Sequence, residues 1–249
     1  MTANMGSNFI ILTTNRSGSV WVISTLSGFQ DVNSQGELFL PRPRVSEKRW
    51  DSEFAYTRYI ETNGLKIRPF SVFSYLNALY SRPGIVGFKL MYAQLGLYPE
   101  ILAYLIRHRI RVVHLIRQNH LDVLISYAVK AQIGKAHLLS GQSAPEDVRV
   151  TLDTKTLVRQ MAWLRNKQNI ARRLLTLCKL PHIEITYEEL LRDQAHFDKI
   201  LNFLSIDPQE QKASSTVVKI RRGGHSDVIR NYDEVKNVLE NSHFAALLE

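Results

Sequence analysis

Short apolar segments that alternate with amphipathic segments are the feature of this sequence that most limits its fold. The apolar runs are four to six residues long, the length of a buried strand. Between them, apolar residues recur with helical spacing. Because strands joined through helices run parallel and are buried on both faces, the pattern predicts an α/β fold with a central, mostly parallel sheet flanked by helices. The predicted strands are Phe9–Thr13, Ile85–Leu90, Arg111–Ile116 and Ile183–Thr186.

The amphipathic segments are predicted to be helices. The clearest is Leu157–Cys178, in which Leu157, Met161 and Leu164 begin an apolar stripe while most Arg and Lys side chains fall on other faces. The polar stretch from Gly134 to Asp153 breaks this pattern and is predicted to be a surface loop. The other predicted helices are Val20–Phe29, Arg49–Glu61, Ser71–Ser81, Pro99–His108, Asn119–Ala131 and Asp193–Leu204.

Length and charge limit the class of protein. A chain of 249 residues fits one large α/β domain or two small ones, and one domain spanning 1–249 is the simpler interpretation. Its single cysteine, Cys178, excludes an internal disulfide. The 32 Lys and Arg against 23 Asp and Glu give a formal charge of +9, which favours nucleic acid, anionic lipid or a polyanionic cofactor. We expect a cytoplasmic protein, since no secretory signal is readable and the apolar region Ile85–Ile106 is too polar to span a bilayer. That region is interrupted by Lys89, Gln94, Pro99 and Glu100.

A polar turn, Asn15-Arg-Ser-Gly-Ser19, joins the first predicted strand to the first predicted helix. Gly18 allows close approach of the backbone, and the first N–H groups of the helix create positive potential where a phosphate would bind. Arg16 adds charge, and Ser17 and Ser19 add hydroxyl donors. The alternative is an ordinary turn in which a serine caps the helix. The Gly-x4-Gly-Lys-Ser/Thr loop of nucleoside triphosphate enzymes is not present.

A second motif follows the third predicted strand, Arg111–Ile116: Arg117 comes directly after the strand and leads into a helix that contains Ser126. Arg117 is expected at the carboxyl end of the strand, where ligands of open α/β sheets bind. Ser126 reaches the same ligand only if the residues directly after Arg117 form a turn instead of regular helix. An arginine at a strand end followed by a serine in the next helix is by itself a common arrangement. The same arrangement in a chain that also contains the first motif is much less common.

The two motifs together resemble those of sulfotransferases that use 3′-phosphoadenosine 5′-phosphosulfate (PAPS), particularly the bacterial and carbohydrate branches. The resemblance implies a single P-loop-like domain, PAPS as donor, and adenosine 3′,5′-bisphosphate as product. It implies that Arg117 and Ser126 bind the 3′-phosphate. The first turn matches the family pattern Arg-Ser-Gly-Ser-Thr-Trp except that Val20 replaces the usual Thr. The residues implied to bind the 5′-phosphosulfate are Arg16, Ser17, Gly18, Ser19, Val20 and Trp21.

Two shorter segments resemble the same family and supply candidates for catalysis. In the segment 36–39, Glu37 is a candidate general base, because an acceptor hydroxyl must lose its proton as it attacks sulfur. In the segment 87–92, Lys89 is a candidate cation for the transferring sulfuryl group or the leaving phosphate. The alternatives are a surface glutamate and a lysine that reaches solvent from a strand end.

Three histidines are weaker candidates for the base. His114 lies inside a predicted strand, where a packed, neutral histidine is expected. His120 and His137 are expected to be more exposed, because they lie beside the second motif and in the predicted loop.

Two segments nearer the C-terminus extend the resemblance. Ile185–Asp193 resembles a structural segment of the family, with Thr186 expected to cap the turn that follows. Arg221 and Arg222 precede Gly223 as in the loop that completes the 3′-phosphate pocket of cytosolic sulfotransferases, although any basic surface turn could match.

The resemblance implies transfer of a sulfuryl group from PAPS to a hydroxyl of a carbohydrate, lipid or small metabolite. No metal is expected, since no Asp, His and Cys cluster has ligand spacing. A P-loop-like small-molecule kinase is an alternative, although the loop lacks the lysine it needs. A non-catalytic binder of nucleic acid or another polyanion is another, but we expect no nucleic-acid partner because the basic residues are scattered.

Segments 42–80 and 134–153 are expected to bind the acceptor, with the second as a lid. Their aromatic residues either line the acceptor pocket or belong to the core. These aromatics are Trp50, Phe54, Tyr56, Tyr59, Phe70, Phe73 and Tyr75.

Overall fold

The computed structural model describes residues 7–40, 56, 60–62, 65–67, 72–134, 138–139, 148–193, 195–208, 217–218 and 224–248. The chain divides into two compact units. The first comprises Met1–Ile116 and Arg173–Ser215, and the second comprises Arg117–Arg172 and Thr216–Glu249. One domain over residues 1–249 stays a prediction.

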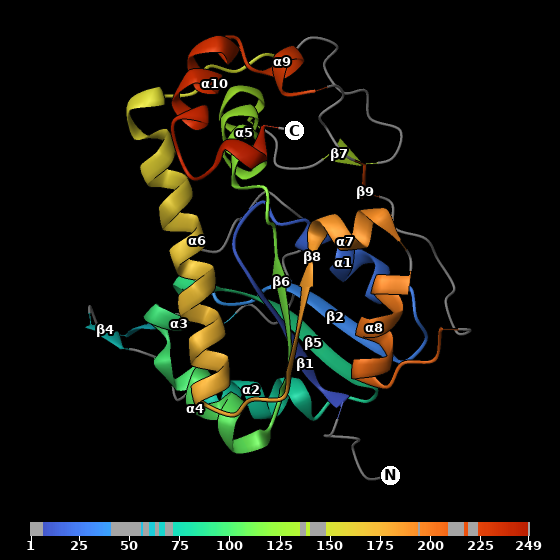
Figure 1. Ribbon diagram of the computed structural model, residues 1–249. Coiled ribbons are helices and arrows are strands. Elements are labelled where there is room, and N and C mark those ends of the chain that lie inside the picture. The colour runs from blue at the N-terminus through green and yellow to red at the C-terminus, as the bar shows by residue number, and fades with distance from the viewer. Residues whose placement is uncertain are drawn as a thin grey trace. The chain divides into compact units, whose positions relative to one another are not determined.

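The first unit is built around a five-stranded sheet in the order β2-β5-β1-β6-β8 (Figure 1). Every neighbouring pair of strands runs parallel, which confirms the predicted α/β fold. β1 and β6 have the predicted bounds because nearly all of their residues are buried. β2 is not among the predicted strands. The bounds are β1 Phe9–Thr13, β2 Val32–Glu37, β5 Ile85–Met91, β6 Arg111–Ile116 and β8 His182–Thr186.

Helices cover both faces of this sheet (Figure 1). On one face, α1, α7 and α8 pack against Phe9, Ile11 and Leu115, which occupy alternate positions of their strands. On the other face lie α2, α3 and α4, and the Tyr80 ring of α2 meets Phe88 of β5 with centroids 6.2 Å apart. The bounds are α1 Ser19–Leu26, α2 Val72–Tyr80, α3 Tyr92–Leu97, α4 Pro99–His108, α7 Tyr187–Arg192 and α8 Ala195–Leu204.

A small hairpin corrects one predicted helix. Residues Ile60–Thr62 form β3, which pairs antiparallel with β4, Leu65–Ile67. The predicted helix Arg49–Glu61 is therefore wrong at its end and at Tyr56, which is not helical, and its other residues lie outside the described ranges. In the sequence the two strands are separated by Asn and Gly, a pair that favours two-residue hairpin connections over helix.

The second unit is mainly helical. α5, His120–Ile133, packs with most of α6, Thr154–Leu177, whose last residues belong to the first unit. Leu121, Met161 and Leu239 are fully buried in the core of this unit. Most of the predicted loop 134–153 lies outside the described residues. The remaining elements are β7 Leu138–Leu139, β9 Val217–Val218, α9 His225–Val228, α10 Tyr232–Glu240 and the 3₁₀ helix Ala245–Leu247.

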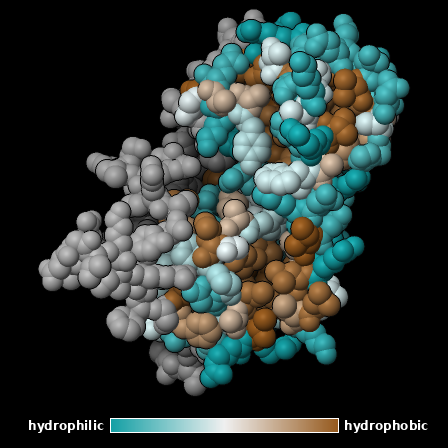
Figure 2. All heavy atoms as spheres, turned by 90° about the vertical axis from the view of Figure 1, so that its left-hand side faces the viewer, coloured by the Kyte–Doolittle hydropathy of each residue, from teal (hydrophilic) through white to brown (hydrophobic). Residues whose placement is uncertain are grey.

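Part of the surface of the first unit is apolar. Brown side chains are concentrated in the lower part of the face shown in Figure 2. Leu97 of α3 and Ile106 of α4 are each 43% exposed. No helix among the described residues combines the length and apolar character needed to cross a membrane.

Candidate functional site

The turn between β1 and α1, residues Thr14–Gly18, has a backbone that suits an anion. Arg16 and Gly18 are left-handed, with φ of 66° and 81°, and such residues shape turns whose N–H groups point into a concavity. Gly18 is the N-cap of α1, and no side chain caps that helix. At α5, by contrast, the Asn119 side chain accepts a hydrogen bond from Asp122 N–H. The structure thus does not show the serine cap, and α1 begins with helical N–H groups at the carboxyl edge of the sheet.

The Ser17 side chain braces this turn. It is fully buried, and its Oγ lies 2.9 Å from Thr14 O and 2.5 Å from Thr13 Oγ1. The Thr13 hydroxyl donates to Leu115 O of β6 over 2.6 Å, so the Ser17 hydroxyl is the donor in its contact with Thr13. This chain of two hydroxyls links the turn to two neighbouring strands, while Arg16 is half-buried. The predicted contact of Ser17 with a phosphosulfate stays a prediction.

Tyr187, the first residue of α7, lies directly against Gly18. A Cβ atom at position 18 would overlap Tyr187 Cδ2, closer than van der Waals contact allows. The Tyr187 ring also meets the Trp21 ring edge-on, with centroids 6.5 Å apart. A capping box fixes α7, because Glu189 N–H donates to Thr186 Oγ1 and Thr186 N–H donates to Glu189 Oε2, and this confirms the predicted cap. The same Thr186 N–H lowers the pKa of Glu189 below its ordinary value.

Changing Gly18 to Ala is expected to destabilise the protein by about 2–4 kcal/mol, from left-handed strain plus displacement of the Tyr187 ring. Gly134 offers a matched control, since its φ is 74° and an added Cβ would meet nothing within 4 Å. Gly134→Ala is expected to cost about 1–2 kcal/mol, from backbone strain alone. Urea denaturation of both variants measures the difference. Equal losses would show that Tyr187 does not constrain position 18.

A β-bulge in β2 places Glu37 beside Lys89. The register pairs Gln35 with Phe88 and Glu37 with Lys89, so that Gly36 is the extra residue. Lys89 Nζ lies 3.0 Å from Glu37 Oε1, and the two side chains are 10% and 23% exposed. The structure therefore brings together the two residues predicted for catalysis, as an ion pair at the carboxyl end of β2, and neither is a fully solvated surface group.

Gln94 of α3 completes the surroundings of this ion pair. Its side chain is buried, and its Nε2 donates to Glu37 Oε2 over 3.4 Å. The two residues are 57 positions apart, so no local motif connects them. The signal in the sequence was a polar residue inside an otherwise apolar region.

In the second unit, an acidic residue holds Arg117. Arg117 is 8% exposed, and its Nη2 lies 2.7 Å from Asp122 Oδ2. Asp122 Oδ1 lies 3.1 Å from His225 Nε2. Neither Asp122 nor His225 was identified from the sequence. Residues 117–119 are not helical, as a contact from Ser126 to the ligand of Arg117 requires, and Ser126 follows Asp122 by one helical turn on the same side of α5. The contact itself stays a prediction.

The two described histidines considered as bases are both buried. His114 is fully buried as expected, with Nε2 2.7 Å from Tyr92 Oη and Nδ1 2.9 Å from Glu184 Oε2, although not in hydrogen-bond direction. The prediction that His120 is more exposed is wrong: His120 is buried, and its Nε2 contacts Gln168 Oε1 of α6 at 3.1 Å.

The described residues contain no group of three His, Cys, Asp or Glu that could hold a metal ion. Three candidates lie outside the described residues: His137, Arg221 and Arg222.

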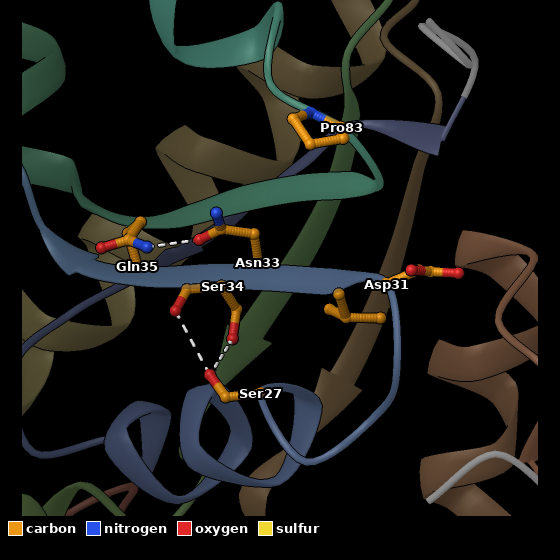
Figure 3. Close-up of a pocket in the computed structure, with 7 residues that line it drawn as sticks. Ser27, Asp31, Asn33, Ser34, Gln35 and Pro83 are labelled. Atoms are coloured by element: carbon orange, nitrogen blue, oxygen red, sulfur yellow. Dashed lines mark hydrogen bonds between the residues drawn. The ribbon is translucent and has the colours of Figure 1, made fainter. Parts of the chain in front are cut away.

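A shallow pocket of about 360 Å³ lies beside β2 (Figure 3). Ser27 Oγ lies 2.6 Å from Ser34 Oγ, and Asn33 accepts a hydrogen bond from Gln35, so these polar side chains already have partners. The ion pair of Glu37 does not line this pocket, which extends toward the amino end of the strand. The lining residues are Ser27, Asp31, Val32, Asn33, Ser34, Gln35 and Pro83.

The segments predicted to bind the acceptor, 42–80 and 134–153, lie largely outside the described residues. Tyr56 is 6% exposed and packs against Phe39 and Tyr75, with centroids 5.1 and 5.2 Å away. Burial raises the pKa of Tyr75 above its ordinary value. Tyr56 therefore belongs to an aromatic core cluster, one of the two alternatives. The aromatics outside the described residues are Trp50, Phe54, Tyr59 and Phe70.

Comparison with known proteins agrees with the resemblance of the two motifs. The sequence matches the Stf0 sulphotransferase family over residues 8–233. No curated protein matches the chain. A solved structure, the sulfotransferase from Alicyclobacillus acidocaldarius, is 14% identical over 97% of this chain and 94% of that chain, with a TM-score of 0.44. Since the family match includes the β1–α1 turn, the Glu37–Lys89 pair and Arg117, the chain belongs to the Stf0 sulphotransferase family.

Proposed function

We propose that the protein transfers a sulfuryl group from PAPS to a hydroxyl of a small-molecule, glycan or lipid acceptor. The observation that carries this proposal is the partly buried Glu37–Lys89 ion pair at the carboxyl end of parallel strands, in a member of a sulfotransferase family. An acid–base group and a cation side by side are what attack by a hydroxyl and departure of a phosphate require. The proposal uses no metal.

The donor is assigned to two sets of residues. The β1–α1 turn would bind the 5′-phosphosulfate through helical N–H groups and the charge of Arg16. Val20 offers no hydroxyl, so Ser19 and the backbone supply the remaining contacts. The other residues assigned to the 5′-phosphosulfate are Ser17, Gly18 and Trp21. The residues assigned to the 3′-phosphate are Arg117, Ser126, Arg221 and Arg222.

The reaction is an in-line displacement at sulfur. The acceptor oxygen forms a bond to sulfur as the bond from sulfur to the bridging oxygen breaks, and that electron pair moves onto the departing phosphate. Glu37 takes the acceptor proton. Lys89 has three N–H donors, so an ammonium that donates to Glu37 can also donate to the bridging oxygen. Positioning and electrostatics supply the catalysis.

The net charge and the expected donor support a proposal for where the protein acts. The formal charge of +9 suits a donor that carries several negative charges. We propose that the enzyme is cytoplasmic, because PAPS is expected in the cytoplasm. Segments 42–80 and 134–153 are the proposed acceptor-binding segments, with a single sulfotransferase domain over 1–249. Nucleic acid is not a proposed partner.

Purified protein is expected to bind adenosine 3′,5′-bisphosphate in calorimetry, and Arg117→Ala is expected to weaken that binding by about 10- to 150-fold. The reason is loss of a charge-assisted contact to the 3′-phosphate. Arg159→Ala, on an exposed position of α6, is the matched control and should leave the affinity unchanged. Circular dichroism confirms that both variants fold.

Other results would point elsewhere. Unchanged affinity in Arg117→Ala would remove Arg117 from the 3′-phosphate site. Magnesium-dependent ATP binding with no response to the bisphosphate would favour a kinase. Salt-sensitive binding of DNA or RNA, again without response to the bisphosphate, would favour a polyanion binder.

A further inference from the structure

The side-chain amide of Gln94 is fixed by two partners, one that donates a hydrogen bond to it and one that accepts a hydrogen bond from it. Its Oε1 accepts a hydrogen bond from Met91 N–H at the start of α3, over 2.9 Å. Because a backbone N–H can only donate, that contact identifies the oxygen and turns the NH₂ group toward Glu37. Nε2 lies 3.4 Å from Glu37 Oε2, and Gln94 is 4% exposed. The orientation of this amide is thus set by the backbone of its own helix.

The Glu37 carboxylate consequently has donors on both oxygens. Lys89 Nζ approaches Oε1 from β5, and Gln94 Nε2 approaches Oε2 from α3. Among the described residues, Lys89 is the charged group that contacts this carboxylate, and Gln94 is the neutral one. Donors on separate oxygens from separate elements restrict rotation of the carboxylate. A carboxylate has about four lone-pair sites, so two donors leave room for an acceptor hydroxyl.

We infer that Gln94 is a positioning residue for the general base, holding the Glu37 carboxylate in the orientation in which it takes the acceptor proton. This inference rests on the proposed role of Glu37. Gln94 itself does not contact the reacting atoms. A base must be aligned with the proton it removes, and small displacements of such a group are costly in rate. A neutral donor orients the carboxylate without adding a second charge to the site.

Gln94→Glu is the decisive variant, because it keeps the shape and the acceptor for Met91 N–H while placing an oxygen where the donor to Glu37 was. Two adjacent carboxyl groups retain a proton between them to higher pH. We expect kcat at pH 7 to fall about 10- to 100-fold and the acid limb of the kcat profile to move up by at least about one pH unit. KM for PAPS should change less than about 3-fold, since the donor site is untouched.

Gln160→Glu is the matched control, since Gln160 is exposed on α6 and the change adds the same charge. It should leave the rate and the pH profile unchanged. The exchange variant Glu37→Gln with Gln94→Glu restores a carboxylate opposite an amide. It should recover the thermal stability that Gln94→Glu loses. It should not recover the wild-type activity, because the carboxylate has moved to position 94.

A second measurement separates failure of this inference from failure of the proposed function. In protein labelled with ¹³C-glutamate, the Glu37 signal is assigned by its loss in Glu37→Gln, and its titration is followed without substrate. In Gln94→Glu this titration should move to higher pH even if the protein transfers no sulfuryl group. Titration and acid limb both unchanged would overturn the role of Gln94. A shifted titration in a protein that neither binds the bisphosphate nor uses PAPS would overturn the proposed function alone.

Discussion

Replacing Glu37 by Gln is expected to reduce kcat for sulfuryl transfer by about 10²–10⁴-fold, the contribution of a positioned general base. The amide has nearly the shape of the carboxylate and keeps an oxygen for Lys89 Nζ, which lies 3.0 Å from Glu37 Oε1. It cannot accept the proton that the acceptor hydroxyl loses. Because Glu37 is not assigned to the donor, the affinity for adenosine 3′,5′-bisphosphate should change by less than about 3-fold.

Transfer from labelled PAPS to an acceptor found in cell extracts measures this effect. Glu240→Gln provides the control, since Glu240 is exposed and forms a surface pair with Lys236 at 3.8 Å. It should retain full activity. If Glu37→Gln kept the wild-type rate and pH dependence, another group would be the base. His114 would be the next residue to change, although it lies fully buried in β6.

The central sheet was readable from the sequence because most of its strands are continuous apolar runs. β1 and β6 begin and end at the predicted residues, and α4 does as well. Such strands are buried on both faces, so burial alone determines their composition. The turn between β1 and α1 was readable because a glycine and an arginine in a strand-to-helix connection are typical of a turn that binds an anion. Its left-handed residues, Arg16 and Gly18, are the physical counterpart of that signal.

β2 was not readable by the same reasoning. Its sequence, Val-Asn-Ser-Gln-Gly-Glu, is polar because it is an edge strand of which only Ser34 is buried. Ser34 is buried through hydrogen bonds to α1, as its Oγ donates to Ile23 O over 2.8 Å. Glu37 was found by local resemblance, without the strand that carries it. The bulge at Gly36, which aligns Glu37 with Lys89, is set by pairing with β5 and leaves no pattern in β2 itself.

The partners of the site residues were the least predictable part. Gln94 reaches Glu37 from 57 positions away, and His225 reaches Asp122 from 103. Tyr187 was seen as part of a structural segment, yet its contact with Gly18 depends on how α7 packs beside α1. Sequence patterns report the environment of one residue along its own element. Contacts between elements depend on the packing of the whole unit.

Lys89→Met is expected to lower kcat by about 10²–10³-fold, the usual loss when a group that stabilises transition-state charge is removed. Methionine fits this buried position of β5, because Lys89 is 8% exposed and methionine is similar in length and shape to the aliphatic part of lysine. Negative charge grows on the bridging oxygen as its bond to sulfur breaks, so the ammonium contributes more in the transition state than in the bound donor. Affinity for adenosine 3′,5′-bisphosphate should therefore fall less than about 10-fold.

Lys236→Met, on the exposed face of α10, is the control and should retain full activity. The double variant Lys89→Met with Glu37→Gln tests whether the two side chains act together in catalysis. When two groups cooperate, the losses of activation free energy in the single variants do not add in the double variant. We expect the double variant to be little slower than the slower single variant. Losses that multiplied would mean that the two side chains act independently despite their 3.0 Å contact. Equal losses of kcat/KM and bisphosphate affinity in Lys89→Met would instead make Lys89 a binding residue for the donor, with no preference for the transition state.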